Sequence, residues 1–250
     1  MSRPVIAGNW KMNHGPDGTR AFFRAFRLPF DGEGPEVLVF PPSVSLVVAV
    51  GCEDRDPRVE VGVQNVHFEE SGAFTGEISA PMAAEAGATH ALVGHSERRH
   101  VFGETDADVR RKVVAALGSG LVPVVCVGET LDERRAGRVE DVVLRQLDAA
   151  LEALEGSEQR FLVAYEPVWA IGTGETATPR DAGAVHQALR GRLSAALGQE
   201  RAAGVPILYG GSVKPDNAGE LLRTPDVDGV LVGGASLDPT SFARIVEAVP

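Results

Sequence analysis

Short, almost purely apolar runs recur along the chain, separated by longer stretches that carry polar residues. Eight such runs are rich in Val, Ile or Leu and lack strict alternation of apolar and polar positions: Val5–Ala7, Val37–Phe40, Val59–Val63, His90–Val93, Val122–Val127, Phe161–Tyr165, Val205–Tyr209 and Gly229–Val232. Continuous apolar runs of this kind are typical of parallel strands that are covered on both faces. The pattern therefore predicts eight parallel strands.

Helical spacing fills the intervals between the runs. One apolar stripe recurs at steps of four, four and three residues: Val143, Leu147, Leu151 and Leu154. This spacing places the four side chains on one face of a helix. Other intervals open with residues that cap helices, namely Thr105 with Asp108, Thr178 before Pro179, and Asp238 before Pro239.

The regular alternation of strand and helix predicts the fold class. We expect an α/β protein in which residues 1–250 form a single (β/α)8 barrel domain, with eight parallel strands ringed by helices. A doubly wound open sheet is the alternative. Such a sheet rarely needs eight regular units, and its Gly-x-Gly-x-x-Gly signature is absent from the turn after the first predicted strand.

Composition narrows the range of partners and compartments. The net charge of −11 disfavours nucleic acids and anionic membranes as general partners, although local donors can still hold a small anionic substrate. The two cysteines, Cys52 and Cys126, lie outside any C-x-x-C pattern, which argues against a disulfide scaffold or a cysteine-built zinc site. The N-terminus lacks the apolar segment of a signal peptide, so we expect a soluble, cytoplasmic protein.

Residues that could take part in binding or catalysis follow the predicted strands at their carboxyl ends, where the active sites of parallel barrels lie. They are Asn9 and Lys11 after the first strand, His95, Ser96 and Glu97 after the fourth, Glu166 after the sixth, Gly210, Gly211 and Ser212 after the seventh, and Gly233 and Gly234 after the eighth. One acid, one imidazole and one ammonium group are thus expected at one rim of the barrel.

The two glycine pairs predict a phosphate site. Without a Cβ atom, backbone N–H groups can approach a ligand closely, and the loops after strands seven and eight often bind phosphate in this architecture. The alternative is that each pair only permits a tight turn. Two pairs on adjacent strand ends, one of them followed by Ser212, favour phosphate binding.

Each charged candidate also has a purely structural alternative. Lys11 could be a solvated surface charge, or in principle a Schiff-base lysine, but its position favours an electrostatic role with Glu97 as partner. His95 opens a predicted short helix, whose N-terminus disfavours a positive charge, so its imidazole should be neutral. A structural role and a catalytic role remain equal alternatives for His95.

Four other histidines are assigned to loops or polar helix faces, where we expect them to be inert: His14, His67, His100 and His186.

Glu166 precedes a segment whose composition is unusual for a surface loop. This segment comprises Pro167, Val168, Trp169, Ala170, Ile171, Gly172, Thr173, Gly174, Glu175, Thr176 and Ala177. Large apolar residues next to glycines predict a lid that closes over the site, and closure would desolvate Glu166 and strengthen it as a base. A buried ion pair between Glu166 and an arginine is the alternative.

Six motifs together resemble the triosephosphate isomerase family over the full length of the chain. They are Ala7–Asn13, Gly72–Glu77, Val93–Arg99, Ala164–Gly174, Tyr209–Val213 and Val232–Ala235. The resemblance implies a TIM barrel that interconverts dihydroxyacetone phosphate and glyceraldehyde 3-phosphate without a metal or organic cofactor.

The resemblance also implies roles for individual residues. Glu166 would transfer the carbon-bound proton and His95 would donate to the carbonyl oxygen, assisted by Lys11 and Asn9. Gly172, Ser212, Gly233 and Gly234 would bind the phosphate, with Asn9 and Lys11 beside it. Segment 64–77 is similar to the loop with which the family forms homodimers, in which Thr75 reaches the partner's site. Glu175 departs from the lysine that the family often has there, which bears on the opening rate of the lid.

Other functions must be weighed against this resemblance. Glu97 and Glu166 could be the acid and nucleophile of a barrel glycosidase, although an aromatic content of 6% leaves few platforms for sugar stacking. Another phosphate-binding barrel enzyme, or a phosphate-binding scaffold without activity, would account for the glycine pairs. The scaffold would not require Glu166, His95 and Lys11 together.

Overall fold

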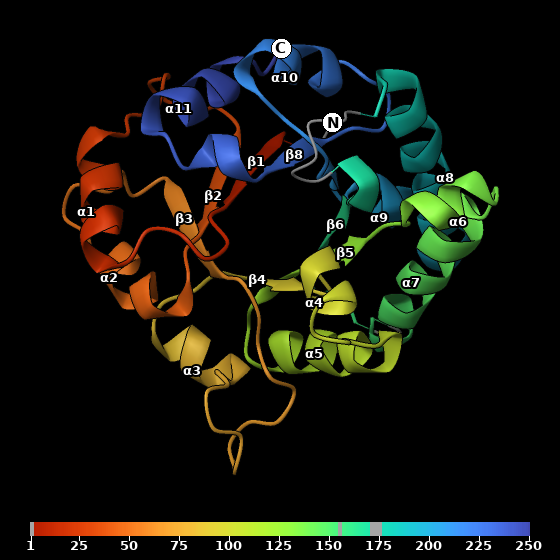
Figure 1. The fold of residues 1–250 in the computed structure, drawn as a ribbon, viewed down its shortest axis with the longest axis horizontal. Coiled ribbons are helices and arrows are strands. Elements are labelled where there is room, and N and C mark those ends of the chain that lie inside the picture. Colours follow the sequence, from red (N-terminus) through yellow and green to blue (C-terminus); the bar gives the residue numbers. More distant parts are fainter. Residues whose placement is uncertain (1–2, 155–156, 171–176) are drawn as a thin grey trace.

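Eight parallel strands close into a barrel in which each strand pairs with its two neighbours along the chain and the first pairs with the last (Figure 1). The computed structural model describes residues 3–154, 157–170 and 177–250. The strands are β1 (Val5–Asn9), β2 (Glu36–Phe40), β3 (Val59–Val63), β4 (His90–Val93), β5 (Val122–Val127), β6 (Leu162–Tyr165), β7 (Ile207–Tyr209) and β8 (Gly229–Val232). The predicted (β/α)8 barrel is therefore confirmed, and the strand bounds differ by only one or two residues.

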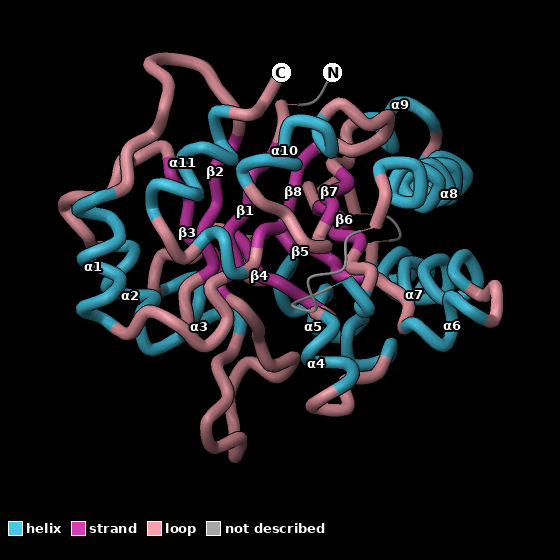
Figure 2. Tube along the Cα trace, turned by 45° about the horizontal axis from the view of Figure 1, so that its top comes forward, coloured by secondary structure: helices cyan, strands magenta, loops and turns pink. Residues whose placement is uncertain are grey.

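Helices surround the strands on the outside of the barrel (Figure 2). In the described ranges the α-helices are α1 (Pro16–Ala25), α2 (Leu46–Val50), α3 (Ala80–Glu85), α4 (Ser96–His100), α5 (Asp106–Gly118), α6 (Leu131–Arg135), α7 (Val139–Ala153), α8 (Pro179–Leu197), α9 (Gln199–Ala203), α10 (Pro215–Leu222) and α11 (Pro239–Glu247). Three short 3-10 helices accompany them, η1 (Ser43–Ser45), η2 (Val168–Ala170) and η3 (Gly234–Ser236). None of the helices in the described ranges is long and apolar enough to cross a membrane.

The predicted caps mark where three of these helices begin. Thr105 and Thr178 each accept a hydrogen bond from the backbone three residues later and form full capping boxes for α5 and α8. The Asp238 side chain accepts from the backbone of Ser241 at the start of α11. Capping satisfies N–H groups that have no partner inside the helix, so local sequence alone decides these boundaries.

Apolar side chains fill the space on both sides of the sheet, which explains why the strands show no alternation. Leu38, Phe40 and Leu92 belong to the cluster inside the barrel, whereas Val39 and Val93 belong to the larger cluster under the helices. The stripe predicted on α7 lies in that outer cluster. Both faces of each strand are therefore removed from water.

The connection between β3 and α3 extends away from the barrel (Figures 1 and 2). Its two arms meet where the backbone N–H of His67 donates to the carbonyl of Ile78 at 2.7 Å. The ring of His67 lies 4.1 Å from that of Phe74, between centroids. Residues 71–77 of this loop, including Thr75, are exposed.

Candidate active site

A cavity of about 380 Å³ opens at the carboxyl ends of the strands. Its lining includes Asn9, Lys11, His95 and Glu166 from three different strand ends, and Ser212, Gly233 and Gly234 from two more. The barrel thus brings together residues that lie more than two hundred positions apart in the sequence. Its volume is within the range that small-molecule sites occupy.

Lys11 has a backbone conformation that side-chain-bearing residues rarely adopt. Its φ is 52°, in the left-handed region, which costs of order 1 kcal/mol or more for such a residue. Two side chains hold the backbone there: Asn9 Oδ1 accepts from the Lys11 N–H at 3.0 Å, and Gln64 Nε2 donates to the Lys11 carbonyl at 2.8 Å. Gln64, which the sequence analysis placed only at the start of the segment similar to the family's dimer loop, thus positions Lys11.

The ammonium of Lys11 is paired as the sequence predicted. Its Nζ lies 2.7 Å from Oε1 of Glu97, and the side chain of Lys11 is about a quarter exposed. Lys11 lines the cavity, and Glu97 beside it is about half exposed. A positive charge is therefore available to the cavity and has its own carboxylate partner when no ligand is present.

His95 precedes α4 and caps it with its own ring. Its Nδ1 accepts a hydrogen bond from the backbone N–H of Glu97 at 3.2 Å, so Nδ1 must carry a lone pair in this arrangement. The proton of a neutral ring then resides on Nε2, which faces the cavity. His95 is buried, and its orientation is the one that a hydrogen-bond donor to a ligand requires.

Glu166 is the most enclosed charged group of the site. Its Oε1 lies 2.9 Å from Nε2 of His95, and its Oε2 accepts from the backbone N–H of Ser96 at 2.8 Å. Its side chain is 2% exposed. The buried partner of Glu166 is thus His95 and not the arginine that the alternative suggested.

The two groups influence each other's protonation. Burial raises the pKa of Glu166, but the His95 ring and the Ser96 amide outweigh it and hold that pKa below its ordinary value. Burial likewise lowers the pKa of His95, and the Glu166 carboxylate raises it above its usual value. The expected strengthening of Glu166 as a base is thus not present while it contacts His95 and Ser96. The raised pKa of His95 opposes the predicted neutral ring, and nitrogen NMR can test which form is present.

Two glycines leave room for Glu166, and the sequence analysis recognised neither role. A Cβ atom on Gly128 would lie 1.7 Å from the carbonyl oxygen of Glu166, and one on Gly210 would lie 2.9 Å from its Cγ. In addition, a Cβ on Gly211 would lie 2.2 Å from the hydroxyl oxygen of Tyr209. Packing therefore requires the pair Gly210 and Gly211, independently of any ligand.

The second glycine pair is different because it borders open space. A Cβ on Gly233 would meet nothing closer than 3.8 Å, and one on Gly234 would meet nothing within 4 Å. In the described part of the chain, the backbone N–H groups of Ser212, Gly233 and Gly234 donate to no protein acceptor. Unused donors beside a cavity suit an anionic group. Gly172, the fourth predicted phosphate donor, lies outside the described residues.

Only the two ends of the predicted lid fall within the described ranges. Pro167, Val168, Trp169 and Ala170 continue from β6, and Ala177 lies buried before α8. Residues 171–176, namely Ile171, Gly172, Thr173, Gly174, Glu175 and Thr176, lie outside them. The expected closure of the segment therefore stays a prediction.

Glu129 anchors the first part of this segment, and sequence reasoning missed it. Its Oε1 accepts from Nε1 of Trp169 at 2.8 Å and from the hydroxyl of Tyr165 at 3.2 Å. Its backbone carbonyl also accepts from the N–H of Val168 at 3.1 Å. The signal that could have revealed it is an acidic residue two positions after the fifth apolar run, because strand ends of a parallel barrel share one rim.

The fold and the site together define a (β/α)8-barrel enzyme whose cavity is lined by the contacting side chains of His95 and Glu166 and by backbone N–H groups that, within the described residues, donate to no protein acceptor. A family model described as triosephosphate isomerase matches residues 4–249. The triosephosphate isomerase of Solibacter usitatus is 51% identical over 98% of this chain and 99% of its own length. That of Herpetosiphon aurantiacus is 50% identical, also over 98% of this chain and 99% of its own. The chain belongs to the triosephosphate isomerase family. The glycosidase alternative has no support from these relatives.

Proposed function

We propose that this chain interconverts dihydroxyacetone phosphate and D-glyceraldehyde 3-phosphate by proton transfer through an enediolate intermediate. The observation that carries the proposal is the direct contact of Glu166 with Nε2 of His95, 2.9 Å apart, inside the cavity. The reaction moves one proton between adjacent carbons and another between the oxygens that these carbons carry, with no net oxidation or reduction, so its chemistry calls for a base and a polarising donor and for no cofactor. The family assignment supports the same reaction.

The substrate's phosphate would bind at the glycine end of the cavity. The N–H groups of Ser212, Gly233 and Gly234 supply donors there. Gly172, which lies outside the described residues, would supply a further donor. Lys11 and Asn9 lie on the same lining and would stabilise the developing oxyanion. An anion is accommodated by these local donors despite the net charge of −11.

Substrate binding would free Glu166 from His95. A substrate carbonyl oxygen that accepts from His95 Nε2 takes the place now held by Glu166 Oε1. Glu166 then loses the contact with His95 that lowers its pKa, while its burial continues to raise it. The carboxylate thus becomes a stronger base when a substrate is present, which limits unproductive protonation in the empty site.

Replacing Glu166 by Gln tests this role. The amide keeps the shape and can still contact Ser96, but it cannot accept the proton, so kcat should fall by at least ~10² to 10⁴ with little change in KM. A coupled isomerase assay measures both. Glu97→Gln at the exposed rim is the matched control, since it removes a carboxylate of the same site that takes no proton from carbon, and it should retain far more of kcat. Near-normal turnover of Glu166→Gln would refute the assignment.

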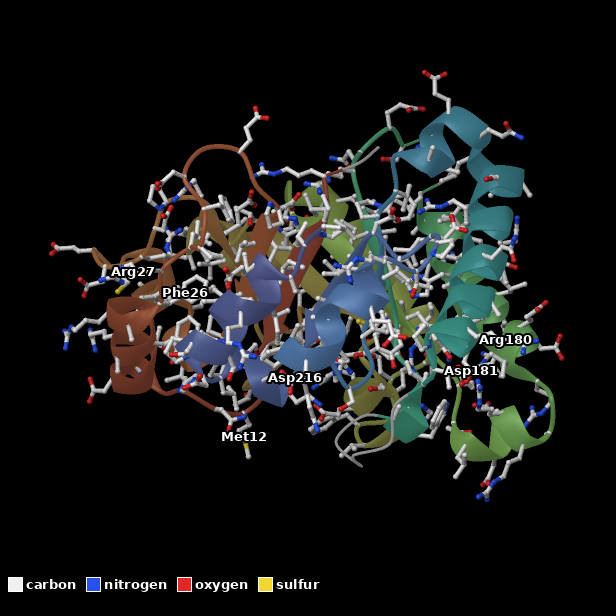
Figure 3. All side chains as sticks on the ribbon, turned by 90° about the horizontal axis from the view of Figure 1, so that it is seen from above. Met12, Phe26, Arg27, Arg180, Asp181 and Asp216 are labelled. Carbon is white, nitrogen blue, oxygen red and sulfur yellow. The ribbon has the colours of Figure 1, made fainter. Side chains whose placement is uncertain are left out.

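We also propose that residues 1–250 act as one domain in a homodimer located in the cytoplasm. Large apolar side chains after β1, β2, β3 and β4 are exposed on the same part of the rim, among them Met12, Val44, Phe74 and Phe102. Met12 is 94% exposed and points away from the barrel (Figure 3). Exposed apolar clusters of this kind favour a protein interface, with Thr75 reaching the partner's site. Both cysteines are free, which is compatible with a reducing compartment.

A further inference from the structure

Two neighbouring connections border the glycine end of the cavity. The connection after β1 contributes Lys11 and Asn13 to the lining, and the connection after β8 contributes Gly233 and Leu237. β1 and β8 are themselves paired in the barrel (Figure 1). A Cβ atom on Gly233 would lie 3.8 Å from Cε of Lys11. The relative position of the two connections therefore decides how far the Lys11 side chain lies from the backbone donors.

The ring of His14 joins the two connections, although the sequence analysis expected this residue to be inert. Its Nε2 lies 2.9 Å from the carbonyl oxygen of Leu237, 223 positions further along the chain. Because a carbonyl oxygen can only accept, Nε2 must carry a proton and donate it. Leu237 directly follows η3, and its own N–H donates to the carbonyl of Gly234 at 3.1 Å. The bond from His14 therefore ends one short turn away from the backbone donors.

The surroundings of His14 hold its ring in place. Its φ is 59°, in the left-handed region that residues with a Cβ atom rarely adopt. The buried hydroxyls of Ser45 and Thr19 donate to its carbonyl at 2.8 and 3.2 Å. Its ring packs edge-on against the buried Trp10, 4.9 Å away between centroids. Glycine or asparagine would occupy this backbone at lower cost, so the conformation alone does not call for an imidazole. What the ring adds is its reach to Leu237.

We propose that His14 is a positioning residue for the substrate's anionic group, because it holds the connection after β8 at a fixed distance from the connection after β1. The inference rests on the proposed function, which places the phosphate among the donors of this region. Asn9 and Gln64 already hold Lys11, so loss of the His14 bond should displace mainly residues 233–237. Contacts to the phosphate exist in the bound substrate and in the transition state alike, so their loss raises KM more than it lowers kcat.

Two amide side chains of different length test the coupling. The Nε2 atom of glutamine can take the place of the imidazole Nε2, whereas asparagine ends near the place of Nδ1, too far from the Leu237 carbonyl. Asparagine also tolerates the left-handed backbone, so His14→Asn removes the bond without adding strain at position 14. His14→Gln keeps a donor to Leu237 and is the matched variant.

His14→Asn should raise KM and weaken the binding of inorganic phosphate by about 3- to 10-fold, which is the effect of one neutral hydrogen bond, while kcat stays within about twofold. His14→Gln should recover most of both losses. His100→Asn, at the exposed end of α4, should change neither value. A coupled isomerase assay gives KM and kcat, and titration calorimetry gives the Kd of inorganic phosphate.

A measurement without ligand tests the bond by itself. The amide of Leu237, which donates to Gly234, should exchange with solvent severalfold faster in His14→Asn than in the unaltered protein. In His14→Gln it should exchange at nearly the unaltered rate. Faster exchange together with unchanged phosphate binding would show that His14 only stabilises the fold, and would overturn the proposal.

The two amide variants provide a second way to overturn it. Equal losses of phosphate binding in His14→Asn and His14→Gln would exclude the bond to Leu237 as the cause. An unaltered protein that lacks isomerase activity, yet binds phosphate more weakly after His14→Asn alone, would refute the proposed reaction and support the positioning role. Phosphate binding therefore separates the failure of one proposal from the failure of the other.

Discussion

At the scale of single residues, the site depends on close contacts that Glu166 makes through its backbone as well as its carboxylate. Gly128 lies against the Glu166 carbonyl, and Gly210 lies against its side chain. The carboxylate is then held by His95 and Ser96. The position of Glu166, the proposed base, is therefore fixed by residues from three different loops, so a small change beside it should affect catalysis.

Gly128→Ala should displace Glu166. Its Cβ would meet backbone atoms of Glu166, which cannot rotate away, so we expect a loss of roughly 1 to 3 kcal/mol in the free energy of unfolding and a fall in kcat. The matched control is Gly118→Ala at the end of α5, where a Cβ meets nothing within 4 Å. That change should be neutral or stabilising by up to about 1 kcal/mol. Denaturant titration and a coupled assay measure both effects; unchanged kcat in Gly128→Ala would contradict the expectation.

His186 shows how burial changes the behaviour of a residue that the sequence pattern assigned to a polar surface. That assignment is wrong, because His186 is fully buried on α8 between Tyr165 and Tyr209. One of its ring nitrogens, Nδ1, bonds the carbonyl of Asp226 at 2.9 Å. Burial lowers the pKa of His186 to about 4, although the Asp226 contacts oppose the shift.

This shift predicts a loss of stability in mild acid. The unfolded chain binds a proton on His186 near pH 6.5 while the folded protein resists it, so the contribution is complete above pH 6.5 and falls as the pH drops towards 4. The loss over this interval should be about 3 kcal/mol in the free energy of unfolding. Denaturant titrations at several pH values should show a shallower decline for His186→Gln. Parallel declines for the two proteins would exclude His186 as the cause.

At the scale of elements, the site residues follow the barrel strands, and contacts between neighbouring connections fix their positions. The turn after β6 is tied to the turn after β5, because Glu129 holds both Trp169 and Tyr165. The guanidinium of Arg134 in α6 lies over the Trp169 ring, 4.8 Å from its centroid. The start of the predicted lid is thus attached to the neighbouring strand–helix unit.

Trp169→Phe should weaken this attachment. It removes the N–H donor to Glu129 and keeps most of the ring, and a hydrogen bond to a charged group contributes about 1.5 to 3 kcal/mol. We expect a severalfold fall in kcat/KM with the barrel intact by circular dichroism. The matched control is Tyr165→Phe, which removes the other donor to the same oxygen without altering segment 167–177. A larger effect of Tyr165→Phe on kcat/KM would argue against a role of the Trp169 contact in catalysis.

At the scale of the whole molecule, the barrel is asymmetric around its rim. The part of the rim after β1 to β4 exposes large apolar side chains and the protruding loop that carries Thr75. These exposed apolar side chains support the proposal that this sector of the rim meets a second copy of the chain.

Thr75→Arg should separate such a dimer. A charged, long side chain cannot be buried in the partner's site without a counter-charge, so subunit dissociation and loss of activity should occur together. Sedimentation velocity and the isomerase assay measure the two. Ala136→Arg, an exposed position after α6, should change neither. Monomers of Thr75→Arg with full activity would show that the loop does not contribute to the neighbouring site.

The sequence alone predicts the order of strands and helices and three helix starts. It also predicts which residues lie at the rim, namely Asn9, Lys11, His95 and Glu166. Each of these follows from neighbours within a few positions: apolar runs, spacing along a helix, and capping residues. Because parallel strands end at a common rim, strand order alone also predicts which residues share the site. The Lys11–Glu97 pair follows in the same way.

Only the tertiary structure decided the contacts between distant parts of the chain. Glu166 bonds Ser96 across seventy positions, Glu129 holds Trp169, Gly128 accommodates Glu166, and His186 lies buried. His14 likewise reaches Leu237 only once the barrel has closed. Local patterns specify which face of an element is apolar. Distances of a few ångströms between side chains depend on barrel closure and strand register, and these set the protonation of the site.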